Sequence, residues 1–166
     1  MRKDQPMPGG TRHPMLEHLE ALVGEWETEA SHQLLPDTVV RGRSTFEWLE
    51  GGHFLIWRVR NEHPDFPDSI SILGCEAPNG SEDPGAPGAS GGHYTLRYFD
   101  SRGVFRQCGL GAEAGSWRFC CEWPGFAQRF TGTFGAGGAT IAGVAELSHD
   151  GGTWEEDLRI TYKRVT

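Results

Sequence analysis

The chain has 166 residues and a formal net charge of −8, a length that suits a single domain with one hydrophobic core. Apolar residues make up 37% and charged residues 23%, proportions that exclude both a disordered polymer and a membrane-embedded protein. The acidic balance argues against binding to nucleic acid or to an anionic membrane surface, because both need a basic face.

The start of the chain changes character at its first proline-led helical run. Residues 1–13 carry proline, glycine and charge without periodicity, which predicts a flexible tail. Pro14 opens a short run with leucines at helical spacing, and Gly24 ends it as a glycine just past a helix does. Ala77–Gly92 is rich in Gly, Pro, Ser and Ala, which predicts a surface loop. The strand pattern continues beyond this loop, so residues 14–166 are predicted to form one domain.

From Gly24 onward the apolar residues alternate with polar ones, as they do in half-solvated β-strands. About ten such segments follow, separated by turns rich in glycine, proline and aspartate. Nearly every connection is short enough for a hairpin, so consecutive segments are expected to pair as an antiparallel meander. The predicted strands are Glu25–Leu35, Val40–Trp48, His53–Arg60, Ser69–Glu76, His93–Phe99, Val104–Leu110, Ser116–Trp123, Phe126–Phe134, Thr140–Ser148 and Thr153–Val165.

A meander of this length has two unpaired edge strands unless it closes on itself. We therefore predict an all-β fold: a closed antiparallel up-and-down barrel of about ten strands, preceded by a short N-terminal helix. Closure would pair the first strand with the last.

The four cysteines, Cys75, Cys108, Cys120 and Cys121, lack the C-x-x-C spacing of a metal or redox site. Adjacent residues of a strand point to opposite faces, so Cys120 and Cys121 are not expected to share a metal ion. We find no apolar run long enough to span a bilayer and no secretory segment at the N-terminus. These features predict reduced, buried cysteines in a cytoplasmic protein without a metal site.

Polar residues on the inner face of a closed barrel are the candidates for function. Alternation from Trp26 places Thr28 and His32 inside, and Glu156 falls on the face of the last strand that Trp154 marks. Antiparallel pairing of these strands would bring His32 close to Glu156. Such a pair could exchange a proton with a substrate or anchor a ligand. A purely structural hydrogen bond and a register slip that exposes one partner are the alternatives.

The predicted lining combines aromatic side chains with a few polar groups, as small-molecule sites do. Each polar group alone is more often a satisfied core residue than a ligand contact. The candidate ligand-binding residues are Thr28, His32, Ser44, Phe46, Trp48, Trp57, Tyr98, Gln107, Gln128 and Glu156.

Four segments occur in a recognisable order: Leu22–Trp26 (LVGEW), Phe46–Leu55 (FEWLEGGHFL), Tyr98–Gly103 (YFDSRG) and Phe126–Phe134 (FAQRFTGTF). Together they resemble the DUF1579-like proteins, an uncharacterised group within the calycin superfamily. The resemblance covers most of the chain, from Leu16 to Val165. It implies a short helix followed by a barrel of about ten strands with an internal cavity.

Lipocalins, fatty-acid-binding proteins and haem-binding nitrobindins are structural relatives within that superfamily. Nitrobindins ligate haem iron through a histidine near the C-terminal end of the chain. The last histidine here is His149, in the turn before the final strand. The resemblance therefore does not carry a haem ligand over, and no cofactor is predicted.

The leading hypothesis is a barrel that binds a small, largely apolar molecule in its cavity. The first alternative is an isomerase-type or cyclase-type enzyme that uses His32 or Glu156 as acid or base. A haem protein with an unrecognised axial ligand and a solidly packed, dimerising stability module are the others. The predicted partners are a small apolar ligand and, for the last alternative, a second copy of the chain.

Overall fold

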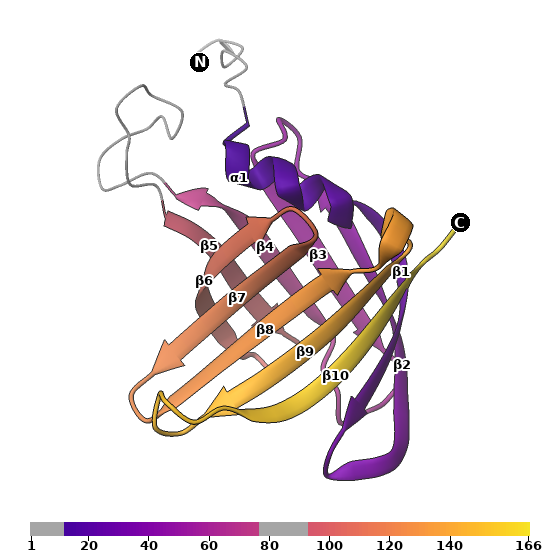
Figure 1. Cartoon of the computed structure of the whole chain (residues 1–166), viewed down its shortest axis with the longest axis vertical. Coiled ribbons are helices and arrows are strands. Elements are labelled where there is room, and N and C mark those ends of the chain that lie inside the picture. Colours follow the sequence, from indigo (N-terminus) through magenta and orange to yellow (C-terminus); the bar gives the residue numbers. More distant parts are fainter. Residues whose placement is uncertain (1–11, 77–92) are drawn as a thin grey trace.

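Ten antiparallel strands form the wall of a closed barrel in which each strand pairs with its neighbours in sequence (Figure 1). The computed structural model describes residues 12–76 and 93–166, so most of the predicted tail and the predicted loop at 77–92 lie outside the described residues. The predicted fold class is confirmed. The strands are β1 (Gly24–His32), β2 (Leu35–Trp48), β3 (Phe54–Asn61), β4 (Ser69–Glu76), β5 (His93–Asp100), β6 (Phe105–Glu113), β7 (Ser116–Trp123), β8 (Phe126–Phe134), β9 (Thr140–Ser148) and β10 (Glu155–Arg164).

The barrel closes between the first and last strands, as the meander pattern predicts. Trp26 of β1 stands opposite Arg164 of β10, and Ala30 stands opposite Ile160. Closure leaves neither strand with an unpaired edge, which removes the main route to edge-to-edge aggregation.

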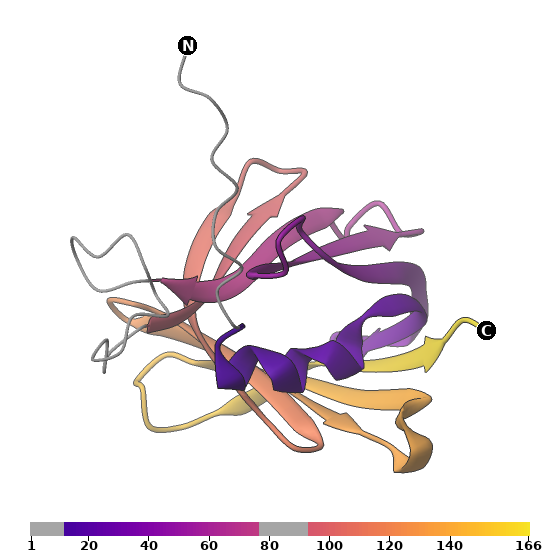
Figure 2. The same cartoon turned by 90° about the horizontal axis from the view of Figure 1, so that it is seen from above.

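One end of the barrel is covered by a short helical segment (Figure 2). Helix α1 (Pro14–Glu17) continues into the 3₁₀ turn η1 (His18–Leu22). Leu16, Leu19 and Leu22 are at most 2% exposed, because the segment turns its apolar side onto the barrel core. We call this the helix end, and the opposite one the open end.

The Gly-x-Trp sequence connects this helical segment to β1. Gly24 has a φ of +126°, and a Cβ there would lie 3.0 Å from an Arg164 guanidinium nitrogen. Glycine allows both this backbone angle and the close approach. Two residues later, the Trp26 indole donates a hydrogen bond of 2.8 Å to the carbonyl of Leu22. The signature therefore has a physical role in docking the helix.

Arg164 fixes the helical segment from the other side. Its guanidinium donates hydrogen bonds of 2.7 Å to the carbonyls of Ala21 and Val23 and lies 4.1 Å above the Trp26 ring. These carbonyls at the end of η1 would otherwise lack intrahelical partners. Arg164 of the last strand, β10, thus anchors the helical segment that leads into β1.

Aromatic rings fill the interior below the helix. Phe46 and Trp57 stack with ring centres 5.3 Å apart, and Trp117 meets Trp57 edge-on at 5.3 Å. Phe130 lies 5.1 Å from Trp117 on the other side. Such edge-on and offset contacts add to the free energy of burying the rings. This half of the barrel is therefore packed, whereas the family resemblance implies a cavity.

Cys108 of β6 and Cys121 of β7 form a disulfide with their Cα atoms 4.3 Å apart, so the prediction of reduced cysteines is wrong for this pair. Gly109 pairs with Cys120 across the β6–β7 hairpin, and the next pair along the ladder is Cys108 with Cys121. Cys120 lies outside the disulfide and is partly exposed. Disulfides are most common in oxidising compartments, so the predicted cytoplasmic location loses its basis in reduced thiols and stays a prediction.

A β-bulge near the start of β10 overturns the predicted position of Glu156. Glu156 stands opposite Glu146 of β9, but Leu158 stands opposite Ala145, so Asp157 is an extra residue in the ladder. An inserted residue reverses which face the preceding side chains occupy. Glu156 accordingly forms hydrogen bonds of 2.6 and 2.7 Å with the guanidinium of Arg159, which is mostly exposed.

Trp154 is affected by the same bulge. Instead of marking the inner face, it packs under the guanidinium of Arg129, 4.1 Å from the ring centre. Arg129 in turn makes a two-pronged ion pair with Glu146, at 2.6 and 3.0 Å. The predicted neighbourhood of His32 and Glu156 is therefore wrong, although the pairing of their strands is confirmed.

Candidate functional site at the open end

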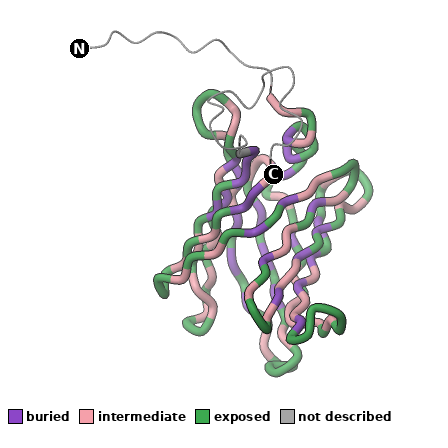
Figure 3. The backbone as a smooth tube through the Cα atoms, turned by 90° about the vertical axis from the view of Figure 1, so that its left-hand side faces the viewer, coloured by how far each residue is buried: buried purple, intermediate pink, exposed green. Residues whose placement is uncertain are grey.

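On β7 and β10 an inward-facing side chain near the open end is more exposed than one near the helix end. On β7 Trp117 is 2% exposed, whereas Trp123, six residues further on the same face, is partly exposed. On β10 Tyr162 is 1% exposed, whereas Leu158 is partly exposed. Figure 3 shows the alternation of buried and exposed residues along the strands that defines the inner face. On these two strands, inner side chains are therefore partly exposed near the open end and buried near the helix end.

The accessible part of the interior is mostly apolar. Its members pack against the buried core, yet each keeps part of its surface exposed. Apolar side chains that a barrel leaves reachable from one side are typical of ligand sites. They are Val59, Tyr98, Trp123, Leu158 and Ile160.

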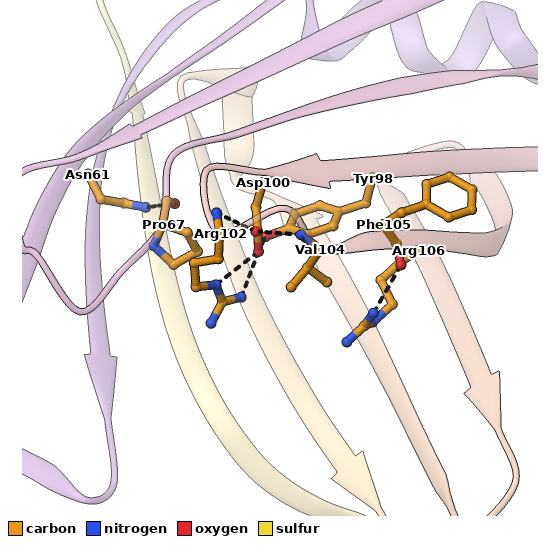
Figure 4. Close-up of polar contacts among 8 residues, drawn as sticks. All are labelled: Asn61, Pro67, Tyr98, Asp100, Arg102, Val104, Phe105 and Arg106. Carbon is orange, nitrogen blue, oxygen red and sulfur yellow. Dashed lines mark hydrogen bonds and ion pairs between the residues drawn. The ribbon is translucent and has the colours of Figure 1, made fainter.

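Arg106 adds a cation to this lining. It stands opposite Tyr98 and in phase with buried Cys108, so its side chain belongs to the inner face. The guanidinium lies 4.6 Å from the centre of the Trp123 ring. It also donates a 2.9 Å hydrogen bond to the carbonyl of Phe105 (Figure 4). No carboxylate pairs with it among the described residues. It is thus placed to meet an anion.

Tyr98, Asp100 and Arg102 form a polar cluster where β5 turns into β6 (Figure 4). The Asp100 carboxylate accepts hydrogen bonds from the Tyr98 hydroxyl, the Arg102 guanidinium and the backbone N–H groups of Arg102 and Val104. Its side chain is wholly covered. With all its partners inside the turn, the carboxylate stabilises the hairpin and has no free oxygen face for a substrate.

The titration of this cluster follows from its contacts. Burial, followed by the hydrogen bond to the Asp100 carboxylate, raises the pKa of Tyr98 to about 12. Burial alone would raise the pKa of Asp100, but hydrogen bonds from Arg102 and Tyr98 and from the backbone hold it well below its ordinary value of 3.8. At neutral pH the phenol is therefore protonated and the carboxylate is charged.

His32 lies at the rim of the open end and pairs with Asp157. Its Nε2 is 2.8 Å from the Asp157 Oδ1, and its Nδ1 accepts a 3.1 Å hydrogen bond from the backbone N–H of Leu34. Because Nδ1 accepts, the hydrogen-bond network assigns the proton to Nε2. Both ring nitrogens are occupied, which leaves none to exchange a proton with a substrate.

The other predicted site residues are spread over three places. Thr28, Ser44, Phe46 and Trp57 are buried in the packed core, where the Ser44 hydroxyl accepts a 3.3 Å hydrogen bond from the Trp57 indole. Trp48 lies at the helix end instead, donating to Glu20 at 2.8 Å under the guanidinium of Arg12. The open end has only His32, Tyr98 and Gln128 of the predicted set.

Gln107 was predicted to face inward and is exposed. Cys108 and Leu110 are buried, so they occupy the inner face, and alternation sends Gln107 outward. The same alternation places Arg106 inside. The sequence pattern contains this signal, but an arginine next to a turn is ordinarily assigned to solvent. Alternation from the buried Trp117 likewise places Trp123 on the inner face of β7.

A hollow of about 230 Å³ lies at the helix end, with lining residues that include Met15, Tyr94, Leu110 and Trp117. The indole nitrogen of Trp117 is the one buried side-chain nitrogen or oxygen without a hydrogen-bond partner among the described residues. Gly132 lies against that nitrogen, since a Cβ there would be 2.4 Å from it. The unpaired donor thus faces backbone and costs stability.

Within residues 12–76 and 93–166, no group of three or more His, Cys, Asp or Glu side chains could hold a metal ion. The same residues contain no helix that is long and apolar enough to cross a membrane.

No family model and no curated protein matches this sequence. Solved structures match its fold. Rv2717c from M. tuberculosis superposes with a TM-score of 0.60 at 11% identity, over 93% of this chain and 99% of that one. The fold is that of a calycin-like barrel.

Two further structures support the same fold. The zebrafish ileal bile acid-binding protein, complexed with cholic acid, has a TM-score of 0.50 at 14% identity, over 87% of this chain and 99% of its own. The S-type phycobiliprotein lyase CPES from Guillardia theta has a TM-score of 0.51 at 12% identity, over 95% and 96%. The resemblance to the DUF1579-like group within this fold stays a prediction.

Proposed function

We propose that this calycin-like barrel binds a small, largely apolar molecule at its open end. The observation that carries the proposal is the change in exposure along β7 and β10, from buried inner residues at the helix end to partly exposed apolar ones at the open end. Transfer of a ligand's apolar surface onto Val59, Trp123 and Leu158 would contribute about 25 cal/mol per Å² removed from water.

We further propose that the ligand has an anionic group. Arg106 is inward-facing and has no carboxylate partner among the described residues, and its guanidinium is already held over Trp123. A guanidinium binds a carboxylate or sulfonate through charge-assisted hydrogen bonds in a fixed geometry. The zebrafish bile acid-binding protein, a barrel of the same fold, is complexed with cholic acid, an apolar ring system with a carboxylic acid.

The acid-base alternative loses its proposed residues. Both nitrogens of His32 have partners, Glu156 lies on the outer face with Arg159, and the Asp100 carboxylate is enclosed in its turn. General acid-base chemistry needs a titrating group within hydrogen-bond reach of the substrate. Binding is therefore the function that the open end supports best.

Two fluorescent probes that differ in charge test the proposal. We expect anilinonaphthalene sulfonate, which is anionic, and phenylnaphthylamine, which is neutral, to bind the wild-type protein. Arg106→Gln should weaken binding of the sulfonate about tenfold, the effect of one charge-assisted hydrogen bond, and leave the neutral probe unchanged. Arg118→Gln, a change on the outer face of β7, is the matched control and should alter neither.

The outcomes separate the two parts of the proposal. If neither probe binds the wild-type protein, the open end is not a ligand site. If both bind and Arg106→Gln weakens neither, the site exists and the anionic requirement is wrong. Trp123→Ala should weaken both probes, because its ring belongs to the apolar lining.

A further inference from the structure

Large apolar side chains gather on the outer surface of β3 to β6, among Arg58, Arg97 and Gln107, where a solvated sheet is normally polar throughout. Large apolar side chains on this surface are from 37% to 51% exposed. An exposed apolar patch of this kind marks an interaction site. We call it the outer apolar face; its members are Phe54, Ile70, Ile72, Phe99 and Phe105.

The opposite wall of the same barrel shows the ordinary pattern. There, outward carboxylates of β1 face outward guanidiniums of β2. Glu27 lies 3.7 Å from Arg43, and Glu29 lies 3.8 Å from Arg41. These cross-strand ion pairs keep that wall in water. Leu34, Leu35 and Val39 are exposed apolar residues at or close to the turn between β1 and β2, but the apolar side chains that the strand register aligns across several strands lie on β3 to β6.

The strand register arranges the outer apolar face in rows across the four strands. One row runs from Arg58 on β3 through Ile70 and Phe99 to Phe105 on β6. The rings of Phe99 and Phe105 lie 5.2 Å apart. The row thus begins with a cation and ends with the most exposed aromatic ring of this face.

A groove of about 310 Å³ lies beside this row, over β3, the start of β4 and the end of β5. Arg58, Ile70 and Phe99 belong to its walls, whereas Phe105 does not. The face therefore carries a protruding ring on one side and a groove on the other. That combination is self-complementary, as a twofold interface requires.

We propose that the outer apolar face is the dimer interface of this protein and that its partner is a second copy of the chain. A twofold axis parallel to the strands, between β4 and β5, exchanges the two sides of each row. It places Phe105 of one copy in the groove beside Arg58 of the other, and Ile70 against Phe99, twice over.

The next outward row runs from Ile56 through Ile72 and Arg97 to Gln107, and the same operation sets Ile72 of one copy against Arg97 of the other. The row beyond it runs from Phe54 through Gly74 and Thr95 to Gly109. The twofold axis sets the Phe54 ring against Gly109, which has no side chain and is exposed. Because barrel walls are convex, close contact centres on β4 and β5, and long side chains bridge the outer strands.

Charge supports a second copy in spite of the net charge of −8. None of these rows contains a carboxylate. Asp68 and Asp100 are the acidic residues of the groove, and the Asp100 side chain is enclosed in its turn beside Arg102. Arg58 keeps its ion pair with Glu47 and can lie over the Phe105 ring of the partner. A guanidinium over an aromatic face is attractive.

Sedimentation velocity of the full chain over a range of concentrations tests the interface. We expect a reversible dimer, and Phe105→Lys should raise its dissociation constant at least 100-fold because it puts a charge into the apolar groove of each partner. Val39→Lys is the matched control: Val39 is 60% exposed on the outward face of β2, outside the interface. It should dimerise as the wild type does.

Circular dichroism and thermal unfolding establish that each variant is folded, and Ile70→Lys provides a second disruption at the centre of the interface. A wild-type protein that is monomeric at all concentrations overturns the proposal, and assigns the face to another partner. Dimers that survive both Phe105→Lys and Ile70→Lys overturn the location, as would dissociation by Val39→Lys. Probe binding at the open end is independent of every one of these outcomes.

Discussion

The helix end and the open end of the barrel are stabilised by different chemistry. At the helix end, leucines and stacked aromatic rings are buried almost completely, and Arg164 ties the helical segment to the last strand. At the open end, turns are held by carboxylates that accept backbone hydrogen bonds. The comparison indicates that the packed half supplies the fold's stability, so the other half can leave apolar surface accessible for a ligand.

Asp100 and Asp150 show how the open end is held. The Asp150 carboxylate accepts hydrogen bonds from the backbone N–H groups of Gly152 and Thr153, at 2.8 and 2.6 Å. These bonds, chiefly the one from Thr153, hold the pKa of Asp150 well below its ordinary value. Asp100 does the same in the β5–β6 turn. Such turns need no core behind them, which is what an open barrel mouth requires.

Two tryptophans on the inner face of β7 give the sharpest test of this difference. Trp117→Ala should lower the free energy of unfolding by about 3–5 kcal/mol, because it empties a filled core. Trp123→Ala should cost only about 1–2 kcal/mol, since the ring is partly exposed and loses mainly its contact with Arg106. Urea unfolding followed by far-ultraviolet circular dichroism measures both.

Trp117→Phe is the control, because it keeps a ring in the core and removes the indole N–H that has no partner. Its cost should be well below that of Trp117→Ala. Equal losses for Trp117→Ala and Trp123→Ala would contradict the division of the barrel into a packed and an open half.

Much of the fold follows from the sequence alone. The two-residue alternation, the short turns and the need to pair both edges predict the closed meander and the meeting of β1 with β10. These signals are repeated in every strand, so an error in one does not affect the rest. The inward positions of Trp26 and Thr28 follow from the same alternation and are confirmed.

The candidate site depends on single residues, and there the sequence is insufficient. One inserted residue, Asp157, reverses the faces of Trp154 and Glu156, and nothing in the local pattern marks the bulge. The position of the β6–β7 turn decides which residues of the two strands stand opposite each other, and so whether Cys108 can bond to Cys121. The turn lies between Glu113 and Ser116, because β6 continues three residues beyond Leu110, where the predicted strand ends.

Acidification should weaken the open end in particular. The pKa of Asp100 is held below its ordinary value of 3.8, so its contribution to stability is present above about pH 4 and is lost as the pH falls further. Asp100→Asn should cost about 1–2 kcal/mol at neutral pH through the loss of the charged hydrogen bonds. It should also flatten the fall in unfolding free energy below pH 4.

Measurement of the urea midpoint from pH 7 to pH 2.5 on wild-type protein and on Asp100→Asn checks this expectation. Glu47→Gln is the comparison, because it removes an exposed carboxylate from a strand instead of a turn. If Asp100→Asn keeps the full acid dependence of the wild type, the carboxylate of this turn does not stabilise the open end.

The smallest expected effect belongs to Glu156, on the outer wall near the open end. Glu156→Gln should change the unfolding free energy by about 0.5 kcal/mol or less, because its Arg159 partner is 67% exposed and water screens the pair. Glu146→Gln, one strand away, should cost more, since its ion pair with Arg129 is less exposed. Probe binding should be unchanged in both. Glu156→Gln could instead weaken binding of the sulfonate probe as Arg106→Gln does. That result would mean that Glu156 faces the interior and that the bulge at Asp157 is absent in solution. The acid-base pair of His32 and Glu156 would then be the better description of the open end.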